Sequence, residues 1–229
     1  MRQGRRIGRE PRSPETRAYP VSLLWVVGTE GGVRQVPLWV IGTEGGVTQV
    51  SAGISYLRGD NMLVRIGDVR DWPFMHALGK LGIADSISPW RKQPMEETLK
   101  YRERILKGFW TWIQQSGSTA FIAEASVEEC EGGPKTGKNR LIGYLVLHTS
   151  AKEELTGLSQ GWIMDFAVLP EWRGKGAGRE LLKAAEDHCR ELGLPYLGLA
   201  VSSHNVRALH LYEQSGFAEE RKLMVKRLE

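Results

Sequence analysis

The chain has 229 residues, of which 41% are hydrophobic and 25% charged, so it has the composition of a folded protein with an apolar core. No apolar run reaches the length of about 18 residues that a membrane-spanning helix needs, and we expect no membrane partner. The net charge is +4, but residues 62–229 carry 23 basic and 22 acidic side chains. Because this part is nearly neutral, we also expect no nucleic-acid partner.

The two cysteines, Cys130 and Cys189, have neither the paired spacing of a zinc site nor the number needed for a disulfide framework. We therefore expect no metal and a reducing, cytoplasmic location. Cys189 lies on the apolar side of a helical pattern, which predicts a buried thiol.

The first 61 residues contain a duplication with a spacing of 14 residues. Residues 24–36 read LWVVGTEGGVRQV and residues 38–50 read LWVIGTEGGVTQV. Each copy predicts a strand, a Glu-Gly-Gly turn and a second strand. The pair is either a small appended β element, which offers a pairing surface, or a poorly ordered extension translated from a mis-assigned start. We favour the second interpretation and predict an N-terminal extension over 1–61 and one domain over 62–229.

From Met62 onward, apolar periodicity and turn residues predict alternating strands and helices. Asp68, with Asp71 three residues later, is typical of a helix start after the first strand. The predicted strands are 63–66, 121–125, 141–147, 163–168 and 196–201, with a closing hairpin at 217–228. The predicted helices start after Asp68 and cover 95–115, 178–192 and 205–215, with loops at 82–94 and 126–140. The sum predicts an α/β fold in which helices cover a mixed sheet.

The segment from Arg173 to Gly178 joins an apolar strand to a long helix and contains three glycines. Glycines let the backbone turn tightly and bring N–H groups to a ligand, and the helix start adds unpaired donors. These features are typical of a phosphate or pyrophosphate site. The loop lacks the Gly-Lys-Ser/Thr ending of a Walker A motif and the G-x-G-x-x-G spacing of a dinucleotide-binding fold.

Two motifs together are more specific than the glycines. Arg173-x-x-Gly176-x-Gly178 resembles the pyrophosphate loop of the GNAT superfamily of N-acetyltransferases, and Asn205-x-x-Ala208-x-x-Leu211-Tyr212-x-x-x-Gly216-Phe217 resembles that family's second cofactor motif. The resemblance covers residues 62–229 in outline and is sharp over 163–217. It implies a mixed, centrally splayed β-sheet flanked by helices.

The resemblance also implies an activity. An enzyme of this family transfers an acyl group, here most readily acetyl, from acyl-CoA to a primary amine of a small molecule or peptide. The alternative is a module that binds acyl-CoA and senses it without turnover. The expected partners are therefore acyl-CoA, with acetyl-CoA as co-substrate, and an amine acceptor. A homodimer is compatible with this interpretation.

The family's cofactor-binding residues carry over onto matching positions of this chain. The backbone of Ala167 and Val168 would pair with the pantetheine amides, much as a strand edge pairs with an added strand. The loop would hold the pyrophosphate, and Asn205 would contact the cofactor near its pantetheine arm. The loop positions are Arg173, Gly174, Lys175, Gly176, Ala177 and Gly178.

The same resemblance makes Tyr212 the general acid that protonates the leaving thiolate, since a tyrosine with a pKa of about 10 carries its proton at neutral pH. The base is less clear. Asp165 is a lone carboxylate in an apolar strand, and is either a base, an anchor for a cationic amine or a partner in a salt bridge. Residues 199–202 lack the glutamate that some family members carry on the next strand. His148 and His204 are weaker candidates.

Three segments are expected to form the acceptor pocket: residues 82–93, the helix around Trp110 and Trp112, and the loop 149–160. Trp90 and the two helical tryptophans are candidate acceptor contacts, although aromatic residues at helical spacing are usually core residues. None of these segments identifies the acceptor.

Overall fold

The computed structural model describes residues 18–20, 39–41, 55–59, 62–126 and 139–228. Most of the duplicated segment lies outside these ranges, as does most of the predicted polar loop at 126–140. Within the second copy, Trp39–Ile41 forms a short strand, β2, which pairs antiparallel with β1 (Ala18–Pro20).

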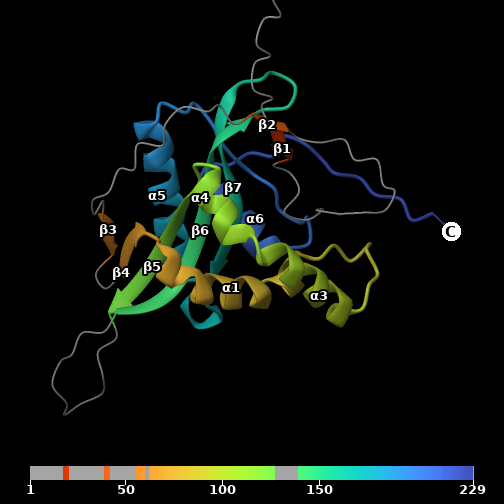
Figure 1. Cartoon of the computed structure of the whole chain (residues 1–229), viewed down its shortest axis with the longest axis horizontal. Coiled ribbons are helices and arrows are strands. Elements are labelled where there is room, and N and C mark those ends of the chain that lie inside the picture. The colour runs from red at the N-terminus through yellow and green to blue at the C-terminus, as the bar shows by residue number, and fades with distance from the viewer. Residues whose placement is uncertain (1–17, 21–38, 42–54, 60–61, 127–138, 229) are drawn as a thin grey trace, which may run out of the picture.

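A six-stranded sheet forms the centre of the fold (Figure 1). Its strand order is β3-β4-β5-β6-β7-β8, and every neighbouring pair is antiparallel except β7 with β8, which is parallel. The strands are β3 (Ser55–Gly59), β4 (Met62–Ile66), β5 (Thr119–Ser126), β6 (Asn139–Lys152), β7 (Ser159–Val168) and β8 (Leu197–Leu199). Strand β3 precedes Met62, so the sheet begins ahead of the predicted domain start. The division of the chain at residue 62 remains a prediction.

Alternating side chains of the central strands supply two cores, one on each face of the sheet. On one face, Phe121 and Leu145 pack with α5 (Ala177–Glu191). On the other face, Ile122 and Val146 pack with α1, α3 and α4. Figure 1 shows α5 on one side of the sheet and α1, α3 and α4 on the other. The predicted mixed α/β architecture is therefore confirmed.

The helices on the second face differ in two ways from the predictions. They are α1 (Trp72–Leu81), α2 (Ile83–Ser86), α3 (Met95–Leu106) and α4 (Phe109–Gln115). The predicted loop at 82–94 contains α2. The predicted single helix at 95–115 is broken before Gly108, the residue that precedes α4, because glycine is a poor helix former and releases the backbone there. The remaining helix, α6, covers Val206–Gln214.

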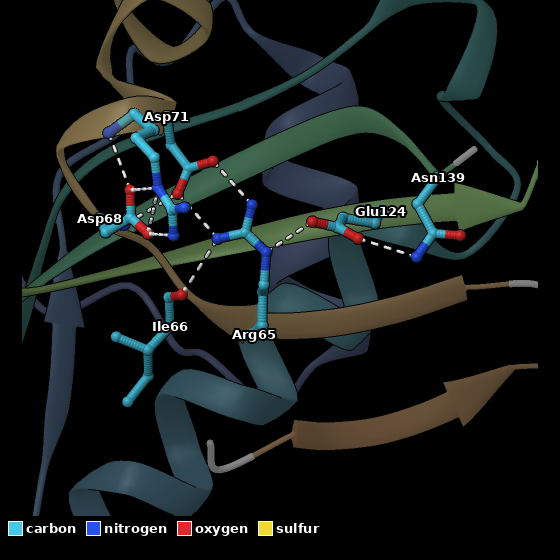
Figure 2. Close-up of polar contacts among 7 residues, drawn as sticks. Arg65, Ile66, Asp68, Asp71, Glu124 and Asn139 are labelled. Carbon is cyan, nitrogen blue, oxygen red and sulfur yellow. Dashed lines mark hydrogen bonds and ion pairs between the residues drawn. The ribbon is translucent and has the colours of Figure 1, made fainter. Parts of the chain in front are cut away.

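An ion-pair cluster fixes the start of α1 to the sheet, and Figure 2 shows it. Asp68 and Asp71 form the predicted capping box around a 3₁₀ turn, Val69–Asp71. The guanidinium of Arg65 on β4 donates to both Asp71 carboxylate oxygens at 2.7 Å and also to Glu124 on β5. These bonds, that to Asp71 first, raise the pKa of Arg65 above its usual value. We refer to Arg65, Asp71 and Glu124 as the Arg65 cluster.

The predicted closing hairpin at 217–228 is wrong, because the structure has no strand or helix in this segment. Arg221 pairs with Glu153 and Glu154 at the β6–β7 turn, while Leu223 is 94% exposed. Leu223, Met224 and Leu228 are exposed and find no sheet face on which to be buried, whereas Phe217 packs against the core. Within the described ranges, no helix is long and apolar enough to cross a membrane.

Candidate functional site

The two parallel strands at the centre of the site separate after a short contact. β7 pairs with β8 only from Gly161 with Leu197 to Ile163 with Leu199. β7 continues to Val168 with β6 as its partner on the other side. Among the described strands, none pairs with the other edge of residues 164–168, and a cavity of about 490 Å³ opens there. The expected splay of the sheet is confirmed.

The predicted strand at 196–201 is shorter than expected, and this difference helps to form the cavity. β8 ends at Leu199, and the next three residues, Ala200–Ser202, line the cavity instead of extending the sheet. The other walls come from the open edge of β7, the loop into α5, helix α6 and the α1–α2 region. A volume of this size is typical of a small-molecule or cofactor site.

The glycine loop turns tightly, as its sequence predicts. Gly174 and Gly176 have φ of 75° and 93°, in the left-handed region that favours glycine. Gly176 caps α5 without a side-chain hydrogen bond, so the first N–H groups of α5 are available to an anion. At Gly178, a Cβ would lie 3.1 Å from Leu211 of α6 and 3.4 Å from Phe166 of β7. Glycine there lets α5 approach its neighbours closely.

The two cationic side chains of the loop have different surroundings. The Nε of Arg173 donates to the carbonyl of Val168 at 3.0 Å, and its Nη1 lies 3.3 Å from Asp85. The ammonium of Lys175 lies 5.1 Å from the centre of the Trp172 ring. Arg173 therefore joins the end of β7 to α2, whereas Lys175 covers an aromatic face.

Tyr212 reaches the cavity from α6. Its ring contacts Phe166 and Phe217, with centroid distances of 6.3 and 5.7 Å. Burial, and after it the negative charge of Asp165, raises the pKa of Tyr212 above its usual value. The phenol is therefore protonated at neutral pH, so this cavity-lining residue can act as a hydrogen-bond donor.

Asp165 lies at the floor of the cavity in a cluster that also contains Arg102 of α3 and Tyr144 of β6. One carboxylate oxygen, Oδ2, accepts from Arg102 at 2.7 Å and from the Tyr144 hydroxyl at 3.0 Å. The other, Oδ1, accepts from the backbone N–H of Phe166 at 3.1 Å. Of the three roles considered for Asp165, the salt bridge is the one this geometry contains. We refer to Arg102, Asp165 and Tyr144 as the Arg102 cluster.

Asn205 is the N-cap of α6. Its side-chain oxygen accepts from the backbone N–H of Ala208 at 3.2 Å, and the residue lines the cavity. The second motif therefore starts with a helix cap, which orients the helix that carries Tyr212.

Nine of the eleven predicted site residues line the cavity. They are Asp165, Ala167, Val168, Arg173, Gly174, Gly176, Gly178, Asn205 and Tyr212. The two others are Lys175, which lies on Trp172, and Ala177, the first residue of α5, which is buried in the core. Motifs more than 25 residues apart in the sequence thus meet at one cavity.

The expected acceptor segments are only partly brought to the site. Residues of 82–86 line the cavity, but the three tryptophans and the loop 149–160 do not. Trp110 and Trp112 pack against the core around Met75, and Trp90 is 74% exposed. The acceptor predictions for these tryptophans are therefore not supported by the structure, and the core alternative holds for the two on α4.

The two histidines and the cysteine also lie outside the cavity lining. His148 is fully buried in β6, where Nδ1 is 2.9 Å from the Ser118 hydroxyl, and burial lowers its pKa to about 4. His204 is exposed. Cys189 is buried as predicted, and burial raises the pKa of its thiol to about 11, which keeps it protonated.

Several lining residues carry no sequence motif, among them Arg102, Asp85 and Arg207. Arg102 is separated from Asp165 by 63 positions, so no local pattern connects them. Gly79 offered one signal, since a glycine inside a helix often marks a close approach. A Cβ at Gly79 would lie 2.6 Å from the Tyr144 hydroxyl, which explains the glycine.

Comparisons with known proteins indicate the same family that the two motifs resemble. The model of the "Acetyltransferase (GNAT) family" matches residues 84–217. The N-acetyltransferase YycN of Bacillus subtilis, itself uncharacterised, is 33% identical over 94 residues, which are 41% of this chain and 58% of that protein. The streptothricin acetyltransferase of Streptomyces lavendulae is 46% identical over 79 residues, 34% of this chain and 39% of that protein. The matches thus span little more than half of YycN and less than half of the second relative.

Solved structures share the fold. A putative acetyl transferase from Pyrococcus furiosus superposes with a TM-score of 0.56 at 22% identity, and the match covers 73% of this chain and 99% of that one. The family model spans more than half of the chain and includes both sequence motifs, most of the cavity-lining residues and Tyr212. The chain therefore belongs to the GNAT family of acetyltransferases.

Proposed function

We propose that this protein transfers an acetyl group from acetyl-CoA to a primary amine of a small molecule or peptide. One observation carries the proposal: the open edge of β7, the left-handed glycine loop and Tyr212 all line the same cavity. A single cavity therefore contains an unpaired strand edge, a backbone suited to an anion and a proton donor. The names of the matched relatives, which are N-acetyltransferases or acetyltransferases, favour acetyl and an amine.

In the proposed complex, each part of the cofactor is bound by a different set of residues. The backbone N–H groups of residues 174–178 and the start of α5 hold the pyrophosphate. The free edge of Ala167 and Val168 pairs with the pantetheine amides. Arg173 and Lys175 add positive charge near the phosphates, and Asn205 orients the start of α6 toward the pantetheine arm.

The reaction is a direct attack of a neutral amine on the thioester carbon. A C–N bond forms, the C–S bond breaks, and the attacking nitrogen loses a proton while the sulfur gains one. Tyr212 supplies the proton-donating hydrogen bond to the sulfur, and the proton released by the nitrogen restores the balance. Because the pKa of Tyr212 is raised, its proton moves only as charge develops on the sulfur.

Asp165 contributes to this reaction through its charge. Since it already accepts from Arg102, Tyr144 and the backbone of Phe166, it is poorly placed to take a further proton. In this proposal, its ion pair with Arg102 holds this part of the cavity in place. Its negative charge acts on Tyr212 and on the incoming amine. The nitrogen then passes its proton to solvent instead of directly to a carboxylate.

The test is turnover of a Tyr212→Phe variant, followed as release of the coenzyme A thiol across a panel of primary amines. We expect the turnover rate to fall about 100-fold, since a positioned acid contributes at least that much, while the Kd for acetyl-CoA stays within about twofold. Tyr196→Phe is the matched control, because Tyr196 is 56% exposed and is not among the cavity-lining residues.

Other outcomes separate the rival functions. A wild-type protein that binds acetyl-CoA tightly but acetylates no amine would be an acyl-CoA sensor. A titration in which ATP binds as tightly as coenzyme A would indicate a general nucleotide-phosphate site. Unchanged turnover in Tyr212→Phe would remove Tyr212 from the mechanism and leave the acetyl transfer itself intact.

A further inference from the structure

Helix α2 crosses one end of the cavity and is tied to both of its walls. The Oδ2 atom of Asp85 lies 3.3 Å from Nη1 of Arg173, at the start of the glycine loop, and 3.1 Å from Nη2 of Arg207, in the first turn of α6. A single carboxylate oxygen therefore bridges two arginines that come from opposite sides of the opening.

A second contact holds the same segment. The hydroxyl of Ser202, in the segment after β8, donates to the backbone carbonyl of Ser86. Gly82, Ile83, Asp85 and Ser86 all line the cavity. The α2 segment, residues 82–86, thus lies against the space that a ligand entering between the two walls has to use.

The charges at this end of the cavity indicate that Asp85 occupies the position of an anionic ligand group. Arg173, Arg207 and the start of α5 attract anions, and among the cavity-lining residues only Asp85 and Asp165 are acidic. Asp165 pairs separately with Arg102 at the floor. A carboxylate presents the same charge sign and the same hydrogen-bond acceptors to an arginine as a phosphate does. Asp85 therefore occupies an anion position between two guanidinium groups.

We infer that Asp85 is a tethered competitor of the cofactor's phosphate groups for Arg173 and Arg207. This inference rests on the proposed function, because it assumes that a coenzyme A thioester enters this cavity. When a phosphate group takes over the two arginines, Asp85 is expelled by like charge and the α2 segment is released. The contact lowers cofactor affinity and makes the cavity accessible to the acceptor only after the cofactor is bound.

The test compares Asp85→Asn with Glu171→Gln in calorimetric titrations with coenzyme A. Both variants remove one negative charge near the glycine loop, and the two side chains are 43% and 49% exposed. Glu171 pairs with Arg140, which is not a lining residue. We expect the Kd to fall about tenfold in Asp85→Asn and to stay within about twofold in Glu171→Gln. A gain of this size corresponds to the loss of one repulsive, partly screened charge near the ligand.

Hydrogen exchange of the backbone of residues 82–87 gives a readout that does not depend on charge alone. In the wild type, exchange should be slow without ligand and faster with saturating coenzyme A. In Asp85→Asn, it should already be fast without ligand. Added protection of these residues by coenzyme A, or equal or weaker binding by Asp85→Asn, would overturn the inference.

The outcomes also separate this inference from the proposed function. If neither protein binds coenzyme A, both fail together. If the wild type binds coenzyme A and acetylates amines while Asp85→Asn binds with the same affinity, only the competitor role of Asp85 fails.

Discussion

Two arginine–carboxylate clusters of the protein contain similar ion pairs, but only the Arg102 cluster contributes residues to the cavity. In the Arg65 cluster, the guanidinium pairs with Asp71 at 2.7 Å and with Glu124, and no member lines the cavity. In the Arg102 cluster, the guanidinium pairs with Asp165 at 2.7 Å, and both residues line the cavity. The bond lengths are the same, and the surroundings differ.

The difference lies in what else depends on each carboxylate. Asp71 closes the capping box of the 3₁₀ turn that precedes α1, so its carboxylate holds the backbone of that turn. Asp165 accepts from Tyr144 and contributes to the raised pKa of Tyr212. Similar ion pairs therefore support the fold in one place and set the electrostatics of a cavity in the other.

The largest expected effect is on turnover in Asp165→Asn. The change removes the Asp165 carboxylate from the guanidinium of Arg102, whose side chain is 8% exposed, and takes a negative charge away from the cavity in which the amine would be positioned. We expect amine acetylation to fall about 100-fold with acetyl-CoA affinity within about twofold, measured by steady-state kinetics and calorimetry. The control Glu124→Gln, in the other cluster, should keep its turnover.

A double variant separates the two roles of Asp165. Asp165→Asn alone should also lose stability, because it removes a buried carboxylate from Arg102. Arg102→Met combined with Asp165→Asn removes both charges of this pair, so part of that stability should return. Turnover should stay low if the charge of Asp165 serves the reaction. Recovery of turnover together with stability would make the Arg102 cluster a second structural cluster and nothing more.

The next effect is on stability in Arg65→Met. Asp71 is 5% exposed at its side chain and would remain without its guanidinium partner. Breaking a buried pair costs roughly 3 to 5 kcal/mol, and the 29% exposure of Arg65 places the expected loss at about 3 kcal/mol. Urea unfolding measures it. Turnover of the folded fraction should be unchanged; a loss of turnover comparable to that of Asp165→Asn would abolish the distinction between the clusters.

A smaller effect is the dependence of stability on pH, which also decides the pH at which the two clusters should be compared. Burial lowers the pKa of His148 from 6.5 to about 4, so between these values the unfolded chain binds the proton more readily than the folded one. His188, whose pKa burial also lowers, acts in the same direction. Stability should therefore decline as the pH falls from 6.5 toward 4.

Urea unfolding at pH 7.5 and at pH 5 tests this dependence. We expect the wild type to lose on the order of 1 to 2 kcal/mol at pH 5, and His148→Gln to lose less. Equal stability of the wild type at both values would contradict the burial of a neutral His148. The two arginine clusters are best compared at pH 7.5, outside this window.

The sequence predicted the parts of the site that depend on local backbone chemistry. The tight turn at Gly174 and Gly176 follows from the glycine spacing, and the helix that starts after Asn205 follows from an apolar helical pattern. The apolar segments 121–125 and 141–147 predicted two strands of the sheet, which are β5 and β6. The hairpin at 217–228 was wrong because the apolar residues of a segment do not say whether a sheet face is available to them.

What the sequence did not predict depends on tertiary proximity. The pairing of Arg102 with Asp165 joins α3 to β7, and the pairing of Asp85 with Arg207 spans 122 positions. A charged residue on a helix is usually exposed, and neither arginine differs in its local pattern from an ordinary surface residue. Only the packing of α1 over Tyr144, which requires Gly79, left a trace in the sequence.

The smallest effect concerns a third ion pair, which tests whether bond length or burial separates the clusters. Lys100 and Glu96 pair at 2.7 Å on α3, the helix that carries Arg102, but their side chains are 74% and 78% exposed. Because solvent screens such a pair, Glu96→Gln should change the free energy of unfolding by less than about 0.5 kcal/mol and leave turnover unchanged. Urea unfolding beside Arg65→Met gives the comparison. If Glu96→Gln lost nearly as much free energy of unfolding as Arg65→Met, ion pairs of equal length would contribute equally to stability in this protein. Burial would then not explain why the Arg65 cluster stabilises the fold.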